Sequence, residues 1–376
     1  RSLVGIFLFG IQTYFLSKLV VYLIRILIFS IDNTLLDQEI FLTFLLGLNI
    51  IDWISILLVI VFQTMLFSIG IQYNKKLINY SAIIVYAGMI IFFLTVFLSD
   101  VKTTTQAFSN ILNFENFLKQ NNILPLITVA GTIFAYFSIV IVSFGDFTRY
   151  VNNERDLTKG NLSLILNLII FSFFSIAIVV GSDVFLNQKF QDLDRIFTNP
   201  TDIIGKFDNL QITIVVLFFI IIASASTNLV ANYIPSQYSL INFLPNKLNL
   251  KSASYTISFL GLIVGIFWLT VLSQIGILSF VDTFSCFFGP LFGVIIADYY
   301  LIKNQTLSNK DLYSIENQSA YYYSKGWHIK GTYSIILGFI FSASTIWNTN
   351  LMFLQSYAWI IGAFISWLTY YLLAKK

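Results

Sequence analysis

The chain has 376 residues, of which 57% are apolar and 10% are charged, and its formal net charge is +3. Soluble domains carry about 25% charged residues, so this composition excludes a water-soluble globule and predicts a membrane protein with many spans. One cysteine and one histidine exclude an internal disulfide and a Cys/His zinc site, and the small net charge argues against nucleic-acid binding.

Ten apolar runs are long enough to cross a membrane as helices, which takes about 20 residues. The runs are 3–29, 53–71, 80–99, 124–145, 161–182, 210–233, 253–272, 278–301, 332–347 and 353–374. Long continuous runs favour helices over a membrane barrel, whose strands alternate apolar and polar residues. We therefore predict an all-α integral membrane protein with one transmembrane domain, residues 1–376.

The loops between the runs differ in their basic residues. With residue 1 in the cytoplasm, fourteen basic residues fall inside and five outside. The inner set is Arg1, Lys75, Lys76, Arg149, Arg155, Lys159, Lys247, Lys251, Lys303, Lys310, Lys325, Lys330, Lys375 and Lys376. The outer set is Lys102, Lys119, Lys189, Arg195 and Lys206. This positive-inside bias predicts a plasma-membrane protein with both chain ends cytoplasmic, and its long outer loops 100–123 and 183–209 are candidates for short interfacial helices.

The first run contains polar side chains that a membrane interior disfavours. Gln12 follows Gly10, a position that allows close approach of another backbone. The Gln12 amide suits a neutral heterocycle that carries N–H and C=O groups, and a helix–helix hydrogen bond is an equally good interpretation. Lys18 lies deep in the run, with no partner evident from the sequence.

The fourth run ends in residues 143–150 (SFGDFTRY). Asp146 and Arg149 are three residues apart, which predicts an i, i+3 ion pair at the cytoplasmic edge. Phe137 lies upstream with other aromatic residues, and such residues more often contact lipid or core than a ligand.

The sixth run carries a cluster of small polar residues. Ala223, Ser226 and Thr227 are spaced i, i+3, i+4 and so share one helix face. One carbonyl and two hydroxyls there could supply three neutral oxygens to a monovalent cation, with further ligands from a second helix. The alternative is that both hydroxyls bond back to the preceding turn and only help helices to pack.

Asn228 and Asn232 are four residues apart in the same run. At about 100° per residue, Asn232 points away from Ala223, so a straight helix cannot direct both groups to one place. The spacing predicts a cation site and a substrate site that are neighbours but distinct.

The eighth run contains Pro290 and ends near Asp298. A proline inside a membrane helix frees a carbonyl and often marks a bend. We interpret Pro290 and Asp298 as gating or structural residues, together with Asp146 and Arg149; a static kink is the simpler account of Pro290.

These segments together resemble the nucleobase:cation symporter-1 family, the permeases for uracil, allantoin, cytosine, hydantoins and related compounds. The resemblance covers essentially the whole chain, and the first motif looks closest to the uracil/allantoin/hydantoin branch. Its motifs are residues 9–13 (FGIQT), 145–150 (GDFTRY), 226–228 (STN) with Asn232, 297–301 (ADYYL) and 311–313 (DLY).

The resemblance implies a LeuT-like fold of two inverted five-helix repeats plus two further helices, in which the ten runs correspond to family helices 3 to 12. It assigns heterocycle binding to Gln12, Phe137, Asn228 and Asn232, and half of a sodium site to Ala223, Ser226 and Thr227. Leu8 departs from the pattern, because hydantoin carriers have a stacking Trp there. Family helices 1 and 2 are absent, so we expect the sequence to begin inside a longer protein.

The leading hypothesis is cation-coupled symport of a nucleobase or cyclic ureide into the cell by alternating access, with sodium or a proton as coupling ion and no cofactor. We expect a monomer whose partners are the heterocycle and membrane lipid. An amino-acid transporter on the same fold is the alternative, with Lys18 as the deep cation. An enzyme is disfavoured, because HExxH, GxSxG and clustered intramembrane carboxylates are missing.

Overall fold

The computed structural model describes residues 1–32, 34–98, 100–111, 113, 120–189, 203–204, 206, 209–268, 270–275, 277–314 and 316–375. The chain divides into two compact units. Unit 1 comprises Arg1–Phe114 with Thr148–Gln274, and unit 2 comprises Glu115–Phe147 with Ile275–Lys376. Within the described residues, ten helices are long and apolar enough to cross a membrane, as predicted. Of the outer basic residues, Lys119 and Arg195 lie outside the described residues.

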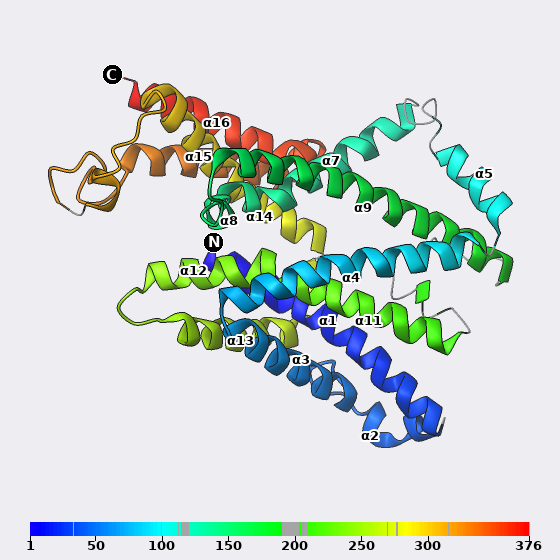
Figure 1. Cartoon of the computed structure of the whole chain (residues 1–376). Helices are drawn as coiled ribbons and strands as arrows, with labels where there is room; N and C mark the ends of the chain where they lie inside the picture. Colours follow the sequence, from blue (N-terminus) through cyan, green and yellow to red (C-terminus); the bar gives the residue numbers. More distant parts are fainter. Residues whose placement is uncertain are drawn as a thin grey trace. The chain divides into compact units, whose positions relative to one another are not determined.

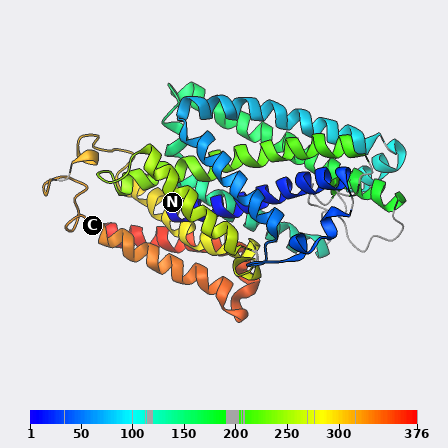
Figure 2. The ribbon, with the colours of Figure 1, turned by 90° about the horizontal axis from the view of Figure 1, so that it is seen from below.

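Unit 1 is built from long helices. They are α1 (Ser2–Ile31), α3 (Ile50–Ser68), α4 (Ile71–Phe97), α9 (Glu154–Lys189), α11 (Leu210–Thr227), α12 (Ile234–Phe243) and α13 (Leu250–Phe267). Its shorter elements are η1 (Leu35–Asp37), α2 (Glu39–Leu42), α5 (Val101–Ile111) and the π-helix η2 (Asn228–Tyr233), which joins α11 to α12. Helix α11 lies beside both α1 and α4 (Figures 1 and 2).

One of these helices differs from the sequence prediction, and one short helix lies where a helix was expected. Helix α9 extends well beyond the apolar run 161–182, because its backbone hydrogen bonding continues through polar turns at both ends. The acidic side chains of Glu154 and Asp156 suit its first turn, where the helix dipole favours negative charge. Helix α5 occupies part of the loop 100–123, in which a short helix was expected.

Capping boxes begin two helices of unit 1. Asn49 Oδ1 accepts the Asp52 N–H at 3.0 Å, and the Asp52 carboxylate accepts the Asn49 N–H at 3.1 Å. This capping box fixes the start of α3, and Asn249 with Ser252 repeats it at the start of α13.

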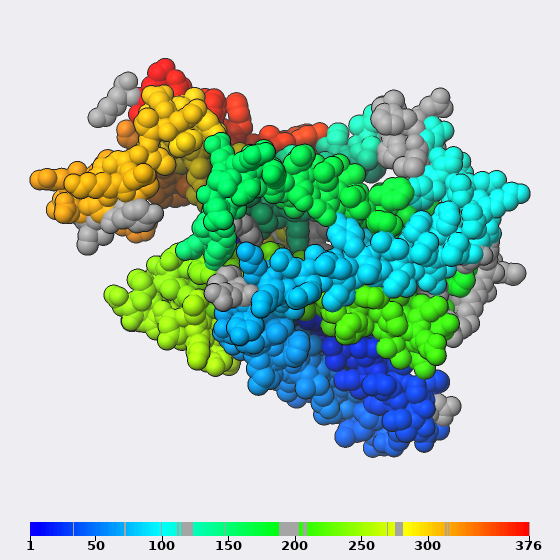
Figure 3. Space-filling model, viewed as in Figure 1, coloured from blue at the N-terminus to red at the C-terminus, as the bar shows by residue number. Residues whose placement is uncertain are grey.

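Helix α1 lies at the centre of unit 1 and packs against α3, α11 and α13. A Cβ at Gly10 would lie 2.5 Å from the Gly261 carbonyl oxygen, which confirms the predicted close approach. Gly261 and Gly265 form a GxxxG motif on α13, and such small residues let membrane helices meet. On the face of the molecule shown in Figure 3, α1 is visible mainly at its C-terminal end.

An aromatic cluster holds the π-helix against α1 and α3. The Tyr233 ring is fully buried, 5.6 Å from the Phe9 ring and 5.1 Å from the Phe67 ring, measured between centroids. Packed aromatic pairs of this geometry add to the stabilisation from buried area. The cluster places the last residue of η2 beside the first half of α1.

Unit 2 contains four long helices and several short ones. The long helices are α7 (Gln120–Val142), α14 (Ile277–Ile296), α15 (Ile329–Trp347) and α16 (Ala358–Ala374). The short ones are the π-helix η4 (Ala297–Ile302) and the 3-10 helices η5 (Asp311–Tyr313) and η6 (Thr349–Tyr357); η3 (Leu272–Ile275) crosses the boundary with unit 1. Helices α15 and α16 run side by side (Figure 2).

Small residues bring α14, α15 and α16 together. A Cβ at Gly289 would lie 2.5 Å from the Trp359 carbonyl oxygen, and one at Gly338 would lie 2.7 Å from the Gly362 carbonyl oxygen. Helix α14 continues without a break through Pro290, and Ser366 donates a hydrogen bond of 2.8 Å to the Pro290 carbonyl. The helix bundle of unit 2 thus encloses the proline in tight packing.

Candidate functional site

Gln12 and Asn232 meet inside unit 1. Asn232 Nδ2 donates to Gln12 Oε1 at 2.8 Å, which joins the π-helix η2 to α1. Gln12 Nε2 in turn donates to the carbonyl oxygen of Ser224, in the last turn of α11, at 3.2 Å. Two residues separated by 220 positions in the sequence therefore form one pair of amides.

A second set of hydrogen bonds continues from this pair. Asn232 Nδ2 also donates to Asn228 Oδ1 at 3.0 Å. Asn228 Nδ2 donates to the Phe9 carbonyl at 3.3 Å and to Thr13 Oγ1 at 3.2 Å. Thr13 Oγ1 donates to Gln63 Oε1 on α3 at 2.9 Å. These four side chains and Gln12 make up what we name the amide network.

Two backbone carbonyls determine the orientation of the amides. A carbonyl only accepts, so Asn228 turns its NH2 group towards Phe9 and its oxygen towards Asn232. For the same reason Gln12 turns its NH2 group towards Ser224 and its oxygen towards Asn232. Asn232 uses both amide hydrogens, and among the described residues its Oδ1 and one Gln12 Nε2 hydrogen have no partner.

The predicted cation residues form a compact group of oxygens at the end of α11. Ser226 Oγ donates to the Ala223 carbonyl at 3.0 Å, and Thr227 Oγ1 donates to the same carbonyl at 2.8 Å. Both hydroxyls thus bond back to the preceding turn, and their lone pairs remain available to a cation.

An apolar cavity of about 360 Å³ borders this group in unit 1. It lies between α4, α9 and α11, and its lining includes Gly88, Phe92, Phe171, Ser175, Ile220 and Ala223. Ala223 therefore belongs both to the wall of the cavity and to the group of oxygens.

The spacing argument for Asn232 needs a correction. It assumed about 100° per residue, but Asn228–Tyr233 forms a π-helix, whose turns are wider than those of an α-helix. Gln12 links the predicted cation residues to the asparagines, because its amide donates to the Ser224 carbonyl next to the cation residues and accepts from Asn232. The group of oxygens at the end of α11 and the Asn232 amide are therefore neighbours, and the Gln12 side chain links them.

Lys18 has a partner that the sequence analysis did not identify. Its Nζ lies 2.7 Å from Asp52 Oδ1, and the Asp52 side chain is only 6% exposed. The same carboxylate caps α3 through the Asn49 N–H, so the ion pair ties α1 to the start of α3.

The remaining predicted site residues lie elsewhere. Phe137 is a half-buried residue of α7 in unit 2, with its ring centroid 5.4 Å from that of Tyr136, so neither unit alone contains all predicted substrate residues. Asp146 lies in α8 (Gly145–Thr148), at the boundary of the units. The Arg149 guanidinium lies 4.8 Å from the centre of the Tyr238 ring, a cation–π contact.

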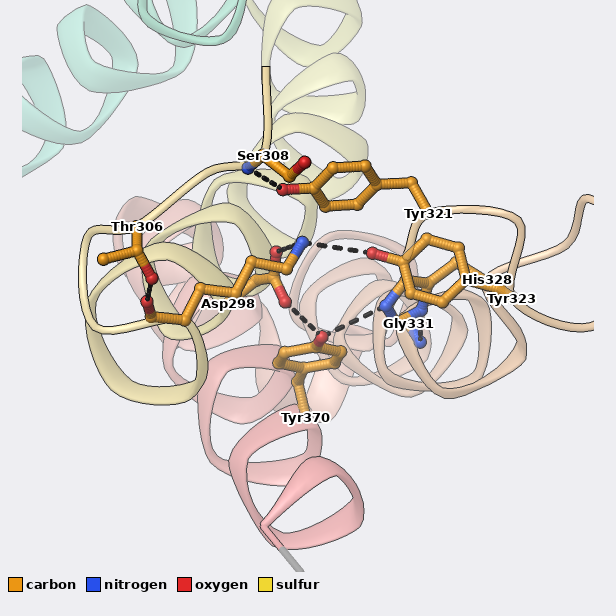
Figure 4. Close-up of polar contacts among 9 residues, drawn as sticks. Asp298, Thr306, Ser308, Tyr321, Tyr323, His328, Gly331 and Tyr370 are labelled. Carbon is orange, nitrogen blue, oxygen red and sulfur yellow. Dashed lines mark hydrogen bonds and ion pairs between the residues drawn. The ribbon is translucent and has the colours of Figure 1, made fainter. Parts of the chain in front are cut away.

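Asp298 lies in the π-helix η4 and has two partners. Its Oδ2 lies 2.7 Å from Lys303 Nζ, and its Oδ1 accepts from Tyr370 Oη at 2.6 Å (Figure 4). Burial lowers the pKa of Lys303, but its hydrogen bonds with Asp298 and Tyr323 outweigh this effect and raise the pKa above its usual value.

The single histidine completes this arrangement (Figure 4). His328 Nδ1 accepts the Gly331 N–H at 2.8 Å and thereby caps α15. The neutral ring then carries its proton on Nε2, which donates to Tyr370 Oη at 3.1 Å. The Tyr323 ring lies 4.0 Å from the His328 ring, between centroids, and its Oη accepts from Lys303 at 3.1 Å.

The sequence matches the family of permeases for cytosine/purines, uracil, thiamine and allantoin over residues 1–362. The chain belongs to this permease family. The resemblance inferred from the sequence motifs is confirmed, and the family consists of transporters, not enzymes.

Individual relatives of this permease are less than one-third identical to it. The allantoin permease of Bacillus subtilis is 29% identical over 244 residues, which cover 65% of this chain and 48% of that protein. The purine-uracil permease of Arabidopsis thaliana is 24% identical over 255 residues, 64% of this chain and 41% of that protein. The chain thus spans about half the length, or less, of these curated relatives.

A solved structure supports the fold. Mhp1, a nucleobase-cation-symport-1 family transporter in a closed conformation with bromovinylhydantoin bound, matches with a TM-score of 0.67 at 18% identity. The match covers 99% of this chain and 73% of that one. The predicted LeuT-like transporter fold is therefore confirmed.

The sequence analysis did not identify three residues that make polar contacts within unit 1. Gln63 is an amide inside the second apolar run, and the cost of burying polar groups in a membrane was the signal that could have identified it. Thr13 directly follows Gln12 in the first motif and was left without a role. Asp52 precedes the second run by one residue, where it was counted as loop.

Proposed function

We propose that this permease carries out cation-coupled symport of a nucleobase or a related cyclic ureide of the uracil, allantoin or hydantoin type, by alternating access. The observation that carries the proposal is the Gln12–Asn232 amide pair, joined at 2.8 Å beside the oxygens of Ala223, Ser226 and Thr227. The relatives described above, an allantoin permease and a purine-uracil permease, support the substrate class.

The free groups of the amide pair suit a ring amide. Asn232 Oδ1 accepts, and the second Gln12 Nε2 hydrogen donates. A cyclic ureide carries a ring N–H next to a C=O, so its N–H would meet Asn232 and its C=O would meet Gln12. This pairing leaves no amide hydrogen of either side chain unused.

Uptake of radiolabelled allantoin, uracil and hydantoin by the full-length protein, including any sequence that flanks residues 1–376, tests the substrate. We expect Gln12→Ala and Asn232→Ala each to raise KM by about tenfold, the effect of losing one or two neutral hydrogen bonds. Asn187→Ala removes an exposed amide from α9 and serves as the matched control. Undiminished uptake in both site variants would refute the substrate assignment.

The coupling ion is proposed to bind at Ala223, Ser226 and Thr227, with sodium as the ion. Neutral carbonyl and hydroxyl oxygens of membrane helices are suited to a monovalent coupling cation. Thr227→Ala should raise the sodium concentration for half-maximal uptake. Thr256→Ala, which removes a similar back-bonded hydroxyl from α13, should leave it unchanged. Uptake that ignores sodium and follows the proton gradient would identify the proton instead.

Both ends of the described chain are proposed to face the cytoplasm. The excess of basic residues on one set of loops supports this orientation. The single cysteine, Cys286, is buried, so labelling of introduced cysteines has a low background. A membrane-impermeant thiol reagent added outside cells should label Lys102→Cys and leave Lys310→Cys unlabelled; the reverse pattern would invert the topology.

The amino-acid alternative loses its supporting observation. It predicted that exposed half-helix N-termini or a cationic group meet the substrate carboxylate, and the deep basic candidate, Lys18, is instead paired with Asp52 at 2.7 Å. Competition of allantoin uptake by excess amino acids should therefore be negligible.

A further inference from the structure

Gln63 belongs to the amide network, but among the described residues it makes no hydrogen bond to Gln12 or Asn232. Gln63, Thr13 and Asn228 each have 0% of their surface exposed. Gln63 Oε1 accepts the Thr13 hydroxyl hydrogen at 2.9 Å, and Thr13 Oγ1 accepts from Asn228 Nδ2 at 3.2 Å. The chain of bonds thus runs from α3 through α1 to the π-helix.

Thr13 behaves unlike other threonines of these helices. The hydroxyls of Thr64, Thr95, Thr256 and Thr369 donate to the carbonyl four residues earlier, the usual bond of a helical threonine. Thr13 donates instead to Gln63 on another helix. Gln63 therefore directs the Thr13 hydrogen away from its own preceding turn.

The carbonyl that Thr13 leaves free is one that the amide network uses. Four residues before Thr13 is Phe9, and the Phe9 carbonyl accepts from Asn228 Nδ2 at 3.3 Å. Without Gln63, the Thr13 hydroxyl would turn to the Phe9 carbonyl and compete with Asn228 for it. Asn228 would then lose the contact that determines its orientation, and Asn232 would lose a fixed acceptor.

The cost of burying Gln63 argues against a role in packing alone. Among the described residues its Nε2 has no hydrogen-bond partner. A buried unpaired donor costs free energy, which an apolar side chain of the same length would avoid. What Gln63 contributes is one acceptor, placed at the Thr13 hydroxyl.

We propose that Gln63 is a positioning residue for substrate recognition, which acts through Thr13 and Asn228 to hold the Asn232 oxygen towards the substrate. The proposal rests on the proposed function, since it assumes that Asn232 binds the heterocycle. It assigns a role to a side chain on α3, a helix outside the pair itself.

The test is the KM for radiolabelled allantoin in the full-length protein. Gln63→Met removes the acceptor at similar length and should raise KM by about three- to tenfold, with unchanged maximal uptake per folded molecule. Gln63→Glu keeps an oxygen acceptor and should restore most of the affinity. Thr64→Val, which removes a half-buried hydroxyl from the next position of α3, should leave KM unchanged.

A double-variant cycle separates positioning from a general structural effect. If Gln63 acts through Thr13, adding Gln63→Met to Thr13→Val should raise KM no further, so the two effects do not multiply. Multiplying effects, or a Gln63→Met protein that loses maximal uptake at constant KM, would overturn the positioning role alone. A wild-type protein that takes up none of the three heterocycles would refute the proposed function and this inference with it.

Discussion

The two units of this permease each contain a polar network, and the networks differ in how completely they are satisfied. In unit 1 the amide network leaves the Asn232 oxygen, one Gln12 hydrogen and the Gln63 Nε2 without a partner among the described residues. In unit 2 the network closes on itself, from Asp298 to Lys303, to Tyr323, to His328 and by way of Tyr370 back to Asp298.

This difference suits the network of unit 1 to substrate recognition and the network of unit 2 to stabilising the fold. A buried amide with unused capacity costs free energy unless a ligand completes it, so the open network of unit 1 is suited to binding. The closed network of unit 2 joins η4, α15 and α16 and leaves the Asp298 carboxylate fully engaged. We therefore expect changes in the amide network of unit 1 to alter affinity and changes in the closed network of unit 2 to alter stability.

The largest expected effect on stability follows from Asp298→Asn. The substitution leaves the Lys303 ammonium, which is 21% exposed, without its counter-charge and weakens the bond from Tyr370. We expect a loss of about 2–3 kcal/mol, because hydrogen bonds to charged groups are the strong ones. Thermal unfolding in detergent measures this loss, while the KM for allantoin should stay unchanged. Glu316→Gln, an exposed acid in the same connection, is the control.

A changed KM in Asp298→Asn with normal stability would break the comparison. It would mean that the closed network takes part in transport. This result would agree with the interpretation of Asp298 as a gating residue in the sequence analysis.

A somewhat smaller effect is expected from Lys18→Met in unit 1. Asp52 would lose its ion pair but keep the Asn49 N–H, so we expect about 1–2 kcal/mol of lost stability. Because Lys18 is a charged group outside the amide network, the KM for allantoin should not change. Measuring both quantities tests whether the chemistry of the contact, rather than the unit that contains it, decides the outcome.

Much of the fold was predictable from the sequence. Membrane helices depend on long apolar runs, so ten spans follow from hydropathy, and the Gly10 contact follows from the small size of the residue. The ends of α9 were not predictable in this way, because the membrane limits only the apolar part of a helix and polar turns extend it at either end.

The candidate site was predictable residue by residue but not as a network. Gln12 and Asn232 were identified as polar residues in apolar runs, yet their contact across 220 positions depends on how α1 meets η2. The π-helix, which changes the direction of Asn232, has no local sequence signal. Lys18 and Asp52 belong to different helices, so only the packing of α1 on α3 could pair them.

A further, smaller effect is expected from the cap of α15. His328→Ala removes the acceptor of the Gly331 N–H and should cost about 1 kcal/mol of stability, the usual contribution of an N-cap. His328→Asn keeps a capping oxygen but loses the contact with Tyr370, so it should recover most of the loss if the cap dominates. Asn249→Ala, at the corresponding position of α13 in unit 1, should cost a similar amount. Equal losses of stability in the Ala and Asn variants of His328 would instead attribute the effect to the contact with Tyr370 in the closed network.

The smallest expected effect is a dependence of the Asp298–Lys303 pair on alkaline pH. The pKa of Lys303 is raised: burial lowers it, but the hydrogen bonds with Asp298 and Tyr323 outweigh the burial. Because the folded pKa exceeds the unfolded value of about 10.4, the stabilisation is complete below that pH and is lost as pH rises through the folded pKa. The difference in Tm between the wild-type protein and Asp298→Asn should therefore be constant from neutral pH to about pH 9 and shrink only above about pH 10.4. A Tm difference that already falls between neutral pH and about pH 9 would show that a group other than Lys303 controls the Asp298–Lys303 pair. The closed network of unit 2 would then be as accessible to solvent as the amides of unit 1.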